Sequence, residues 1–284
     1  MALLLGLIGS ACSGGDDAGS SPPTTERPPF VLVALGDSYS AGEGAPPYDA
    51  EPETCHRSPE SWTRRLDVDS TDVASIRQLA CSGAHIGHVV DGWPSRGLRA
   101  QVPAEPDPTV TLVTITIGGN DIGFGDIVAA CFVFRCPKPD SEGFLASLDA
   151  LRTALEDQLW PALSAAYPNA LLVQVGYPRI TPAEGTEPQD CFWLSSGDQT
   201  AAAGIVDALD DLVWEVAEDH GAQYVDVADV LEGHEMCTAE PWVNGISLGA
   251  DAGNAHPNAA GQAAIEAEVA RQLGIDLTPT LSAG

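Results

Sequence analysis

The sequence predicts an α/β protein built on a five-stranded parallel sheet. From residue 30 onward, short apolar runs alternate with longer stretches of helical pattern. The runs are apolar at successive positions, so both faces of each strand are expected to be buried, as in a parallel sheet. Strands that alternate with helices are joined by right-handed crossovers in such a sheet. With 284 residues, 44% of them hydrophobic, the chain can bury a substantial core.

Five apolar runs are the expected strands. The first is FVLVAL at 30–35, which ends at the Gly-Asp-Ser turn, and the clearest is TVTLVTITI at 109–117, which ends at GGND. The other three are ASIRQLA at 74–80, ALLVQV at 170–175 and AQYVDV at 222–227. Helical patterns separate the strands at about 142–167, 198–219 and 258–273. The segments 39–72 and 121–141 are expected to be loops held by cysteines around the ligand crevice.

The N-terminal residues indicate export. The apolar run ALLLGLI at 2–8 is too short to span a bilayer, and it is followed by the small residues of GSAC. Residues 1–12 are expected to be a signal segment, and its last four residues, 9–12, are similar to a bacterial lipobox with Cys12 as the lipidated residue, although Gly9 stands where leucine is usual. Plain secretion is the alternative. Residues 13–29 are expected to be a flexible linker, 30–275 the folded domain and 276–284 a C-terminal tail.

Charge and cysteine content restrict the partners and the compartment. The formal net charge of −29 comes from 41 acidic and 12 basic residues, which argues against binding to nucleic acid or to an anionic membrane surface. Six of the seven cysteines lie in the folded part and none forms a CxxC pair, so we expect three disulfides and an extracellular or cell-surface location. No heptad pattern suggests assembly, and a monomer is expected.

Polar turns follow three of the expected strands, and their residues suit acyl transfer. Ligands of such a sheet bind outside the carboxyl ends of the strands, so Ser38, Gly83 and Asn120 are expected to face one crevice. A serine nucleophile needs a general base, for which His256 is the candidate. A tetrahedral intermediate needs hydrogen-bond donors, which the backbone at Gly83 and the amide of Asn120 could supply. Ser38 as an ordinary turn residue is the alternative.

Four blocks of the sequence resemble the SGNH, or GDSL, hydrolase family. They are GDSYSAGEG with Ser38, LACSGA with Gly83, GGND with Asn120, and HPNAAGQ with His256, and the likeness covers nearly all of 30–273. The resemblance implies a three-layer α/β/α, flavodoxin-like fold and a serine esterase or lipase without a cofactor. It further implies that Ser38 is the nucleophile, that His256 is the base, and that the Ser38 N–H, the Gly83 N–H and the Asn120 side chain form the oxyanion hole.

Two further segments, CHRSPESW at 55–62 and GYPRI at 176–180, are similar to the secreted actinobacterial branch of these esterases and lipases. In that branch the cysteines pair in sequence order. The resemblance therefore implies the disulfides Cys55–Cys81, Cys131–Cys136 and Cys191–Cys237.

The chain departs from the family where a triad acid is common, three residues before the histidine. That position is Gly253. The hypothesis is a Ser38–His256 dyad in which the carbonyl of Gly253 or Asn254 accepts a hydrogen bond from His256. A turn that brings in Asp251 is the alternative.

The same blocks are compatible with other functions. The same residues would serve a carbohydrate O-acetyl esterase acting on polysaccharide, and a surface binding protein without catalysis is a third reading. His85 and His88 near Cys81 could suggest a metal site, but the sequence places no carboxylate near them and Cys81 is expected in a disulfide, so no metal is expected. The expected partner is a small-molecule or lipid ester substrate.

Overall fold

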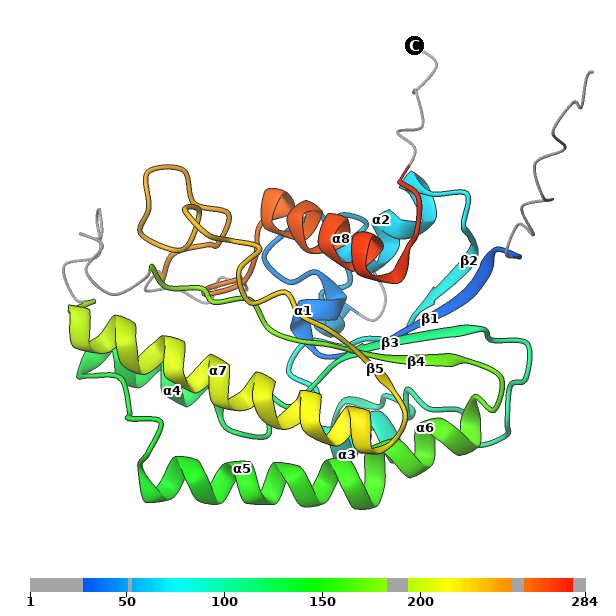
Figure 1. Ribbon diagram of the computed structural model, residues 1–284, viewed down its shortest axis with the longest axis horizontal. Helices are drawn as coiled ribbons and strands as arrows, with labels where there is room; N and C mark the ends of the chain where they lie inside the picture. The colour runs from blue at the N-terminus through cyan, green and yellow to red at the C-terminus, as the bar shows by residue number, and fades with distance from the viewer. Residues whose placement is uncertain (1–27, 51–52, 183–193, 247–252, 278–284) are drawn as a thin grey trace, which may run out of the picture.

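The expected parallel sheet is confirmed. The computed structural model describes residues 28–50, 53–182, 194–246 and 253–277. Its five strands are all parallel and lie in the order β2-β1-β3-β4-β5, the flavodoxin-like order (Figure 1). The strands are β1 (Phe30–Gly36), β2 (Val73–Gln78), β3 (Leu112–Thr116), β4 (Leu171–Val175) and β5 (Gln223–Val225).

Helices cover both faces of the sheet and complete a three-layer architecture (Figure 1). On one face lie α1 (Ser38–Ala41), α2 (Trp62–Asp69) and α8 (Ala259–Leu273). On the other lie α3 (Ile86–Val90), α5 (Glu142–Ala154), α6 (Trp160–Ala166) and α7 (Ser196–Asp219). Single turns of 3-10 helix are formed by Glu53–Cys55 and Pro94–Arg96.

Alternate residues of the central strands supply two separate cores, because successive side chains of a strand point to opposite faces. Leu32 of β1 and Leu112 of β3 pack against α2 and α8 through residues such as Leu66 and Ile265. Val33, Leu35, Val113 and Ile115 pack on the other face against the long helices. Strand β3 is buried along its whole length, as the apolar run predicts.

Two helical expectations need correction. The pattern at 142–167 is not one helix: α5 is followed by a π-helical turn at Leu155–Leu159 and then by α6. Pro161 stands in the first turn of α6 and has no N–H to donate, so the regular hydrogen-bond ladder cannot run through this point. The segments 39–72 and 121–141 are not only loop, since the first contains the eight-residue helix α2 and the second the ten-residue helix α4 (Phe124–Val133).

The turn after β1 is held by two close approaches of backbone. Gly36 has φ +116°, and a Cβ at this position would lie 2.2 Å from the Thr116 carbonyl oxygen of β3, so only glycine fits. The buried side chain of Gln101 accepts from the Gly36 N–H at 2.7 Å and donates to the Gly36 carbonyl at 2.8 Å. These contacts fix the path of the chain into Asp37 and Ser38.

At the C-terminal end of the folded part, Asp276 and Leu277 contact the domain. The Ser70 hydroxyl donates to the Asp276 carbonyl at 2.7 Å, and the Asp276 N–H donates to the Asp72 carboxylate at 2.8 Å. Among the described residues, no helix is both long and apolar enough to cross a membrane.

Candidate active site

The hydroxyl of Ser38 lies in the turn at the carboxyl end of β1. Asp37 caps α1, and its Oδ1 accepts from the Tyr39 N–H at 3.0 Å. The Asp37 N–H donates to the Thr116 carbonyl at 3.0 Å. These bonds tie the turn to the neighbouring strand, so the position of the Ser38 hydroxyl at the sheet edge is set by the backbone.

His256 lies against Ser38 although 218 residues separate them in the chain. Its Nε2 is 2.7 Å from the Ser38 Oγ, and its Nδ1 is 2.7 Å from the Asn254 carbonyl oxygen. A carbonyl oxygen can only accept, so Nδ1 must carry the proton that it donates. In the neutral ring Nε2 is then an acceptor, and the Ser38 hydroxyl donates to it.

The surroundings of His256 favour this neutral form. Burial lowers the pKa of His256, while the negative charge of Glu43 and the hydrogen bond to Asn254 act in the opposite direction. The net shift is downward from the ordinary value of 6.5. At neutral pH the imidazole is therefore free to take a proton.

Gly253 cannot carry the missing acid on this backbone. It has φ +112°, and a Cβ there would lie 3.0 Å from the Gly44 Cα. An aspartate at this position would be strained both by its φ and by that contact. The Gly253 carbonyl instead accepts the backbone N–H of His256 at 3.1 Å. Of the two expected carbonyls, Asn254 is the one in contact with the ring, and Asp251 lies outside the described residues.

A left-handed residue aims the Asn254 carbonyl at the ring. Ala255 has φ 59°, an unusual conformation for a residue with a Cβ. Its carbonyl accepts from the Tyr39 hydroxyl at 2.9 Å, and its N–H donates to the Asn244 carbonyl at 3.1 Å. Hydrogen bonds at both backbone groups of Ala255 thus hold a conformation that would otherwise be costly.

Three hydrogen-bond donors border the same cavity as Ser38 and His256. Within the described ranges, the backbone N–H groups of Ser38 and Gly83 have no protein acceptor. The Asn120 side-chain amide donates one hydrogen to the Ala84 carbonyl at 3.0 Å, which fixes its orientation and leaves its second N–H available. The expected residues Ser38, Gly83, Asn120 and His256 therefore all line one cavity.

Tyr177 is a residue of the site that sequence reasoning did not single out. Its buried hydroxyl donates to Asp37 Oδ2 at 2.5 Å and accepts from the Gly119 N–H at 2.9 Å. It therefore links the turn after β1 to the turn after β3. Burial raises the pKa of Asp37 to about 7, with the bond from Tyr177 opposing that rise. The sequence signal for Tyr177 was its position just after β4, at the same edge of the sheet as the other site residues.

Glu43 is the second residue that sequence reasoning missed. It lines the cavity beside His256, the Ser82 hydroxyl donates to its carboxylate, and His56 Nδ1 lies 3.5 Å from its Oε1. It is only 9% exposed. The sequence signal was its position: Glu43 is an acidic residue within GDSYSAGEG, shortly after the serine. Its charge makes it the negative group that acts on His256.

One wall of the cavity is apolar and comes from α4, within a segment expected to be loop. The cavity has a volume of about 370 Å³. Phe124, Val128, Phe132 and Val133 line it from α4, and Ile246 adds a further apolar side chain. A cavity with polar donors at one end and this apolar wall can hold a reacting carbonyl and an attached hydrocarbon chain.

Two of the expected disulfides are present at the border of the site. Cys55–Cys81 precedes the Ser82-Gly83 turn, and the Ser82 N–H donates to the Cys55 carbonyl at 3.1 Å. Cys131–Cys136 joins the last turn of α4 to the chain beyond it. Cys237 is disulfide-bonded, and its expected partner Cys191 lies outside the described residues, as does Cys12.

The reason given against a metal near His85 needs correction. Asp121 lies 3.7 Å from His85 Nδ1, so the fold does place a carboxylate beside this histidine. The sequence did not reveal this contact because the two residues belong to different turns of the sheet edge. In the part of the chain that the structure describes, no group of three or more histidine, cysteine or acidic residues could hold a metal ion.

Known proteins share both the sequence and the fold of this chain. The sequence matches the GDSL-like Lipase/Acylhydrolase family over residues 34–264. It is 31% identical over 255 residues to a lipase from Streptomyces rimosus, covering 87% of each chain. It is 33% identical over 266 residues to Lipase 1 from Streptomyces coelicolor, covering 89% of each.

Solved structures of similar sequence share the fold of this chain. The extracellular lipase from Streptomyces rimosus superposes with a TM-score of 0.68 at 30% identity, and phospholipase A1 from Streptomyces albidoflavus with 0.67 at 30%. Each comparison covers 86% of this chain and 99% of the other. Because the family match and these relatives span most of the sequence, the chain belongs to the GDSL-like lipase/acylhydrolase family and is a carboxylic ester hydrolase.

Proposed function

We propose that this ester hydrolase works through an acyl-enzyme on Ser38, with His256 as the only side chain that moves protons. The observation that carries the proposal is the pair of 2.7 Å contacts on either side of the His256 ring. They select the tautomer with the proton on Nδ1, in which the lone pair of Nε2 accepts from the Ser38 hydroxyl. A hydroxyl is a poor nucleophile unless a base of this kind takes its proton.

The reaction follows in two halves. Ser38 Oγ forms a bond to the ester carbonyl carbon as its proton passes to His256 Nε2. The carbonyl electron pair moves onto oxygen, where the Ser38 N–H, the Gly83 N–H and the Asn120 amide donate to it. The bond to the alcohol then breaks, and His256 returns the proton to the alcohol oxygen. Water attacks the acyl-enzyme by the same steps and restores Ser38.

The imidazolium formed in each half is stabilised without a triad acid. The Asn254 carbonyl presents a partial negative charge to Nδ1 at 2.7 Å. Glu43 adds a full negative charge in the same cavity, and that charge raises the pKa of His256 against the effect of burial. We propose that the carbonyl positions the ring and that Glu43 supplies the longer-range electrostatic part.

The apolar wall of α4 suggests an acyl group larger than acetyl. Its side chains and Ile246 offer hydrocarbon contact along a cavity of about 370 Å³. Two relatives are named lipase and phospholipase A1, and these names support a lipid ester as substrate. We therefore place this function before that of a carbohydrate O-acetyl esterase.

We further propose that the enzyme is exported and tethered. Disulfides form in oxidising compartments, and the lipobox-like segment 1–12 with the linker 13–29 would leave the domain on a membrane surface through Cys12. Residues 30–275 then form the hydrolase domain, and 276–284 its tail, in a protein that acts as a monomer. Metabolic labelling with palmitate would detect the lipid on Cys12.

Replacement of Ser38 by alanine tests the proposed nucleophile. We expect Ser38→Ala to lower kcat on p-nitrophenyl esters by about 10⁴-fold or more, because the acyl-enzyme cannot form. It should also abolish covalent labelling by a fluorophosphonate, in which the serine oxygen displaces fluoride from phosphorus. Ser147→Ala on α5 is the control, since among the described residues the Ser147 hydroxyl donates only to the Phe144 carbonyl of its own helix. Full activity in Ser38→Ala would overturn the proposal.

The pH dependence tests His256 as base. The base must be neutral, and the pKa of His256 lies below 6.5, so kcat/KM should rise with pH through a midpoint below 6.5 and then stay level. Glu43→Gln removes the charge that raises this pKa, so it should move the midpoint to lower pH. Glu60→Gln, an acid of the α2 region outside the cavity, should leave it in place. A midpoint that moves upward in Glu43→Gln would contradict the account.

A larger side chain on α4 tests the acyl site. Val128 lines the cavity and is half-buried, so Val128→Trp should fill the space for a long chain. We expect kcat/KM for octanoyl esters to fall by about tenfold or more, with acetyl esters little changed. Asp126→Trp places the same side chain on an exposed position of the same helix and is the control. Equal losses on short and long esters in Val128→Trp would contradict the assignment.

A further inference from the structure

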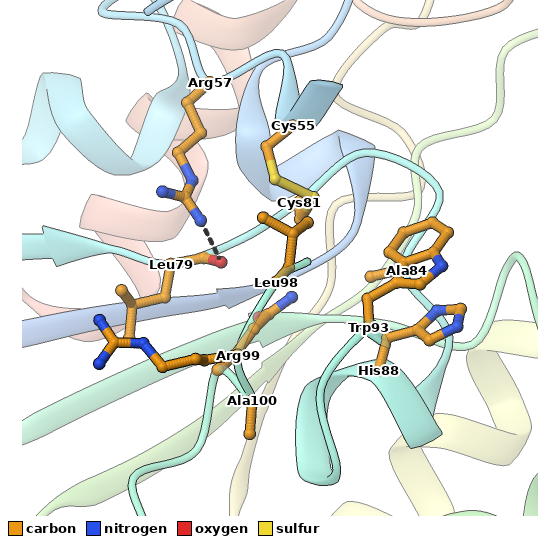
Figure 2. A pocket seen from close by; sticks show the side chains of 11 residues that line it. Cys55, Arg57, Leu79, Cys81, Ala84, His88, Trp93, Leu98, Arg99 and Ala100 are labelled. Atoms are coloured by element: carbon orange, nitrogen blue, oxygen red, sulfur yellow. Dashed lines mark hydrogen bonds between the residues drawn. A yellow bond between two sulfur atoms is a disulfide. The ribbon is translucent and has the colours of Figure 1, made fainter. Parts of the chain in front are cut away.

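A second cavity lies behind the turn that carries Gly83. Its volume is about 220 Å³, and Cys81 and Ala84 line it from one side of the turn, while Ser82 and Gly83 line the catalytic cavity from the other. In Figure 2, Arg57 and Arg99 lie on one side of this cavity and the stacked rings of Trp93 and His88 on the other. Nothing in the proposed reaction uses these side chains.

The cavity gathers positive charge in a strongly acidic chain. The sequence has only 12 basic residues against 41 acidic ones. Six arginines form ion pairs with carboxylates, namely Arg64, Arg65, Arg77, Arg152, Arg179 and Arg271. The described arginines without such a pair are Arg57, Arg96, Arg99 and Arg135. Two of these four, Arg57 and Arg99, line one cavity, a third, Arg96, lies over the Trp93 ring of its wall, and no carboxylate is among the described residues that line it.

Arg57 is held in place without a carboxylate in contact. Its Nε donates to the Ala80 carbonyl at 2.7 Å and its Nη2 to the Leu79 carbonyl at 2.9 Å. The acid whose charge acts on it, Asp49, is itself paired with Arg64 at 2.9 Å. Burial lowers the pKa of Arg57, which means that its charge is partly desolvated. A partly desolvated charge whose hydrogen-bond partners are neutral carbonyls is stabilised further by a bound anion.

Arg99 lines the cavity, and Arg96 lies against Trp93, which also lines it. The Arg96 guanidinium lies 3.8 Å over the Trp93 ring and donates to the Thr54 and Ser82 carbonyls at 3.3 Å. The Trp93 and His88 rings are stacked at 3.9 Å, which gives this wall a rigid surface. Arg99 is exposed, and its guanidinium has no hydrogen-bond or ion-pair partner in the described ranges. All five of its N–H groups are available.

We propose that this cavity binds a phosphate-type oxyanion, either free or as the phosphate of an ester. Two guanidinium groups that approach from different elements suit an anion with several oxygens better than a single carboxylate. The volume of about 220 Å³ admits a phosphate and the first atoms attached to it, and it is smaller than the cavities of about 300–1,000 Å³ that hold drug-sized ligands. A long-range field from a net charge of −29 repels anions, so binding must come from these local contacts.

The site would touch the catalytic turn from behind. The Cys55–Cys81 disulfide lines the cavity directly before Ser82 and Gly83, and a Cβ on Gly83 would lie 3.4 Å from the Trp93 ring. Gln101, which also lines the cavity, holds the Gly36 backbone ahead of Ser38. An anion bound here therefore contacts the framework of the oxyanion donors without entering the catalytic cavity.

Equilibrium binding of two anions tests the proposal independently of catalysis. Isothermal titration calorimetry at pH 7 and low ionic strength would compare inorganic phosphate with glycerol 3-phosphate on the full chain. The variant is Arg99→Gln, which removes no bond within the described protein and should fold normally. The control is Arg271→Gln, whose arginine is 68% exposed on α8 and pairs with Glu268 of the same helix.

We expect saturable binding to the wild-type protein and a dissociation constant about tenfold higher or more in Arg99→Gln, the size of one lost charge-assisted contact. Arg271→Gln should stay within about twofold of wild type. Tighter binding of glycerol 3-phosphate would identify an esterified phosphate as the ligand, and tighter binding of inorganic phosphate the free ion. Absence of saturable binding for both anions, or equal affinity in wild type and Arg99→Gln, would overturn the proposal.

Discussion

The hydrogen bond from His256 to the Asn254 carbonyl is the interaction on which the rest of the site depends. It fixes the proton on Nδ1 and so leaves Nε2 free for the Ser38 hydroxyl at 2.7 Å. A neutral carbonyl can orient the ring only if its own position is fixed. Here the next residue, the left-handed Ala255, is fixed by hydrogen bonds to Tyr39 and Asn244. The absence of a side chain at Gly253 lets the loop pass against Gly44.

The sheet edge supplies the rigidity that this arrangement needs. Gln101 clamps both backbone groups of Gly36, and Tyr177 joins Asp37 to the Gly119 backbone. Ser38 and the amide donors are thereby held in place by the same strands. The turn at 81–84 then separates two chemically different spaces, an apolar one beside α4 and a positively charged one beside Arg57 and Arg99.

Sequence reasoning reached the parts of the site that follow from local pattern. Buried strands and the polar turns after them predicted that Ser38, Gly83 and Asn120 would face one crevice, because parallel strands end at one edge.

Contacts between distant segments could not be predicted from the sequence. The choice of the Asn254 carbonyl rests on a φ of 59° at Ala255, and the Tyr177–Asp37 bond spans 140 residues. The helix α4 was missed because the segment 121–141 was expected to be a loop held by cysteines. The Arg57 and Arg99 cluster could not be predicted, since those residues lie 42 positions apart and are joined only by the fold.

The most direct test of the dyad is the turnover of an Asp251→Ala enzyme beside His256→Ala. Asp251 is the remaining acid by which a triad could be completed close to the histidine in the sequence. If the Asn254 carbonyl orients His256, kcat of Asp251→Ala should stay within about tenfold of wild type, while His256→Ala loses about 10³-fold or more. Removal of a true triad acid costs about 10⁴-fold in kcat, so a loss of about 10³-fold or more in Asp251→Ala would contradict the dyad.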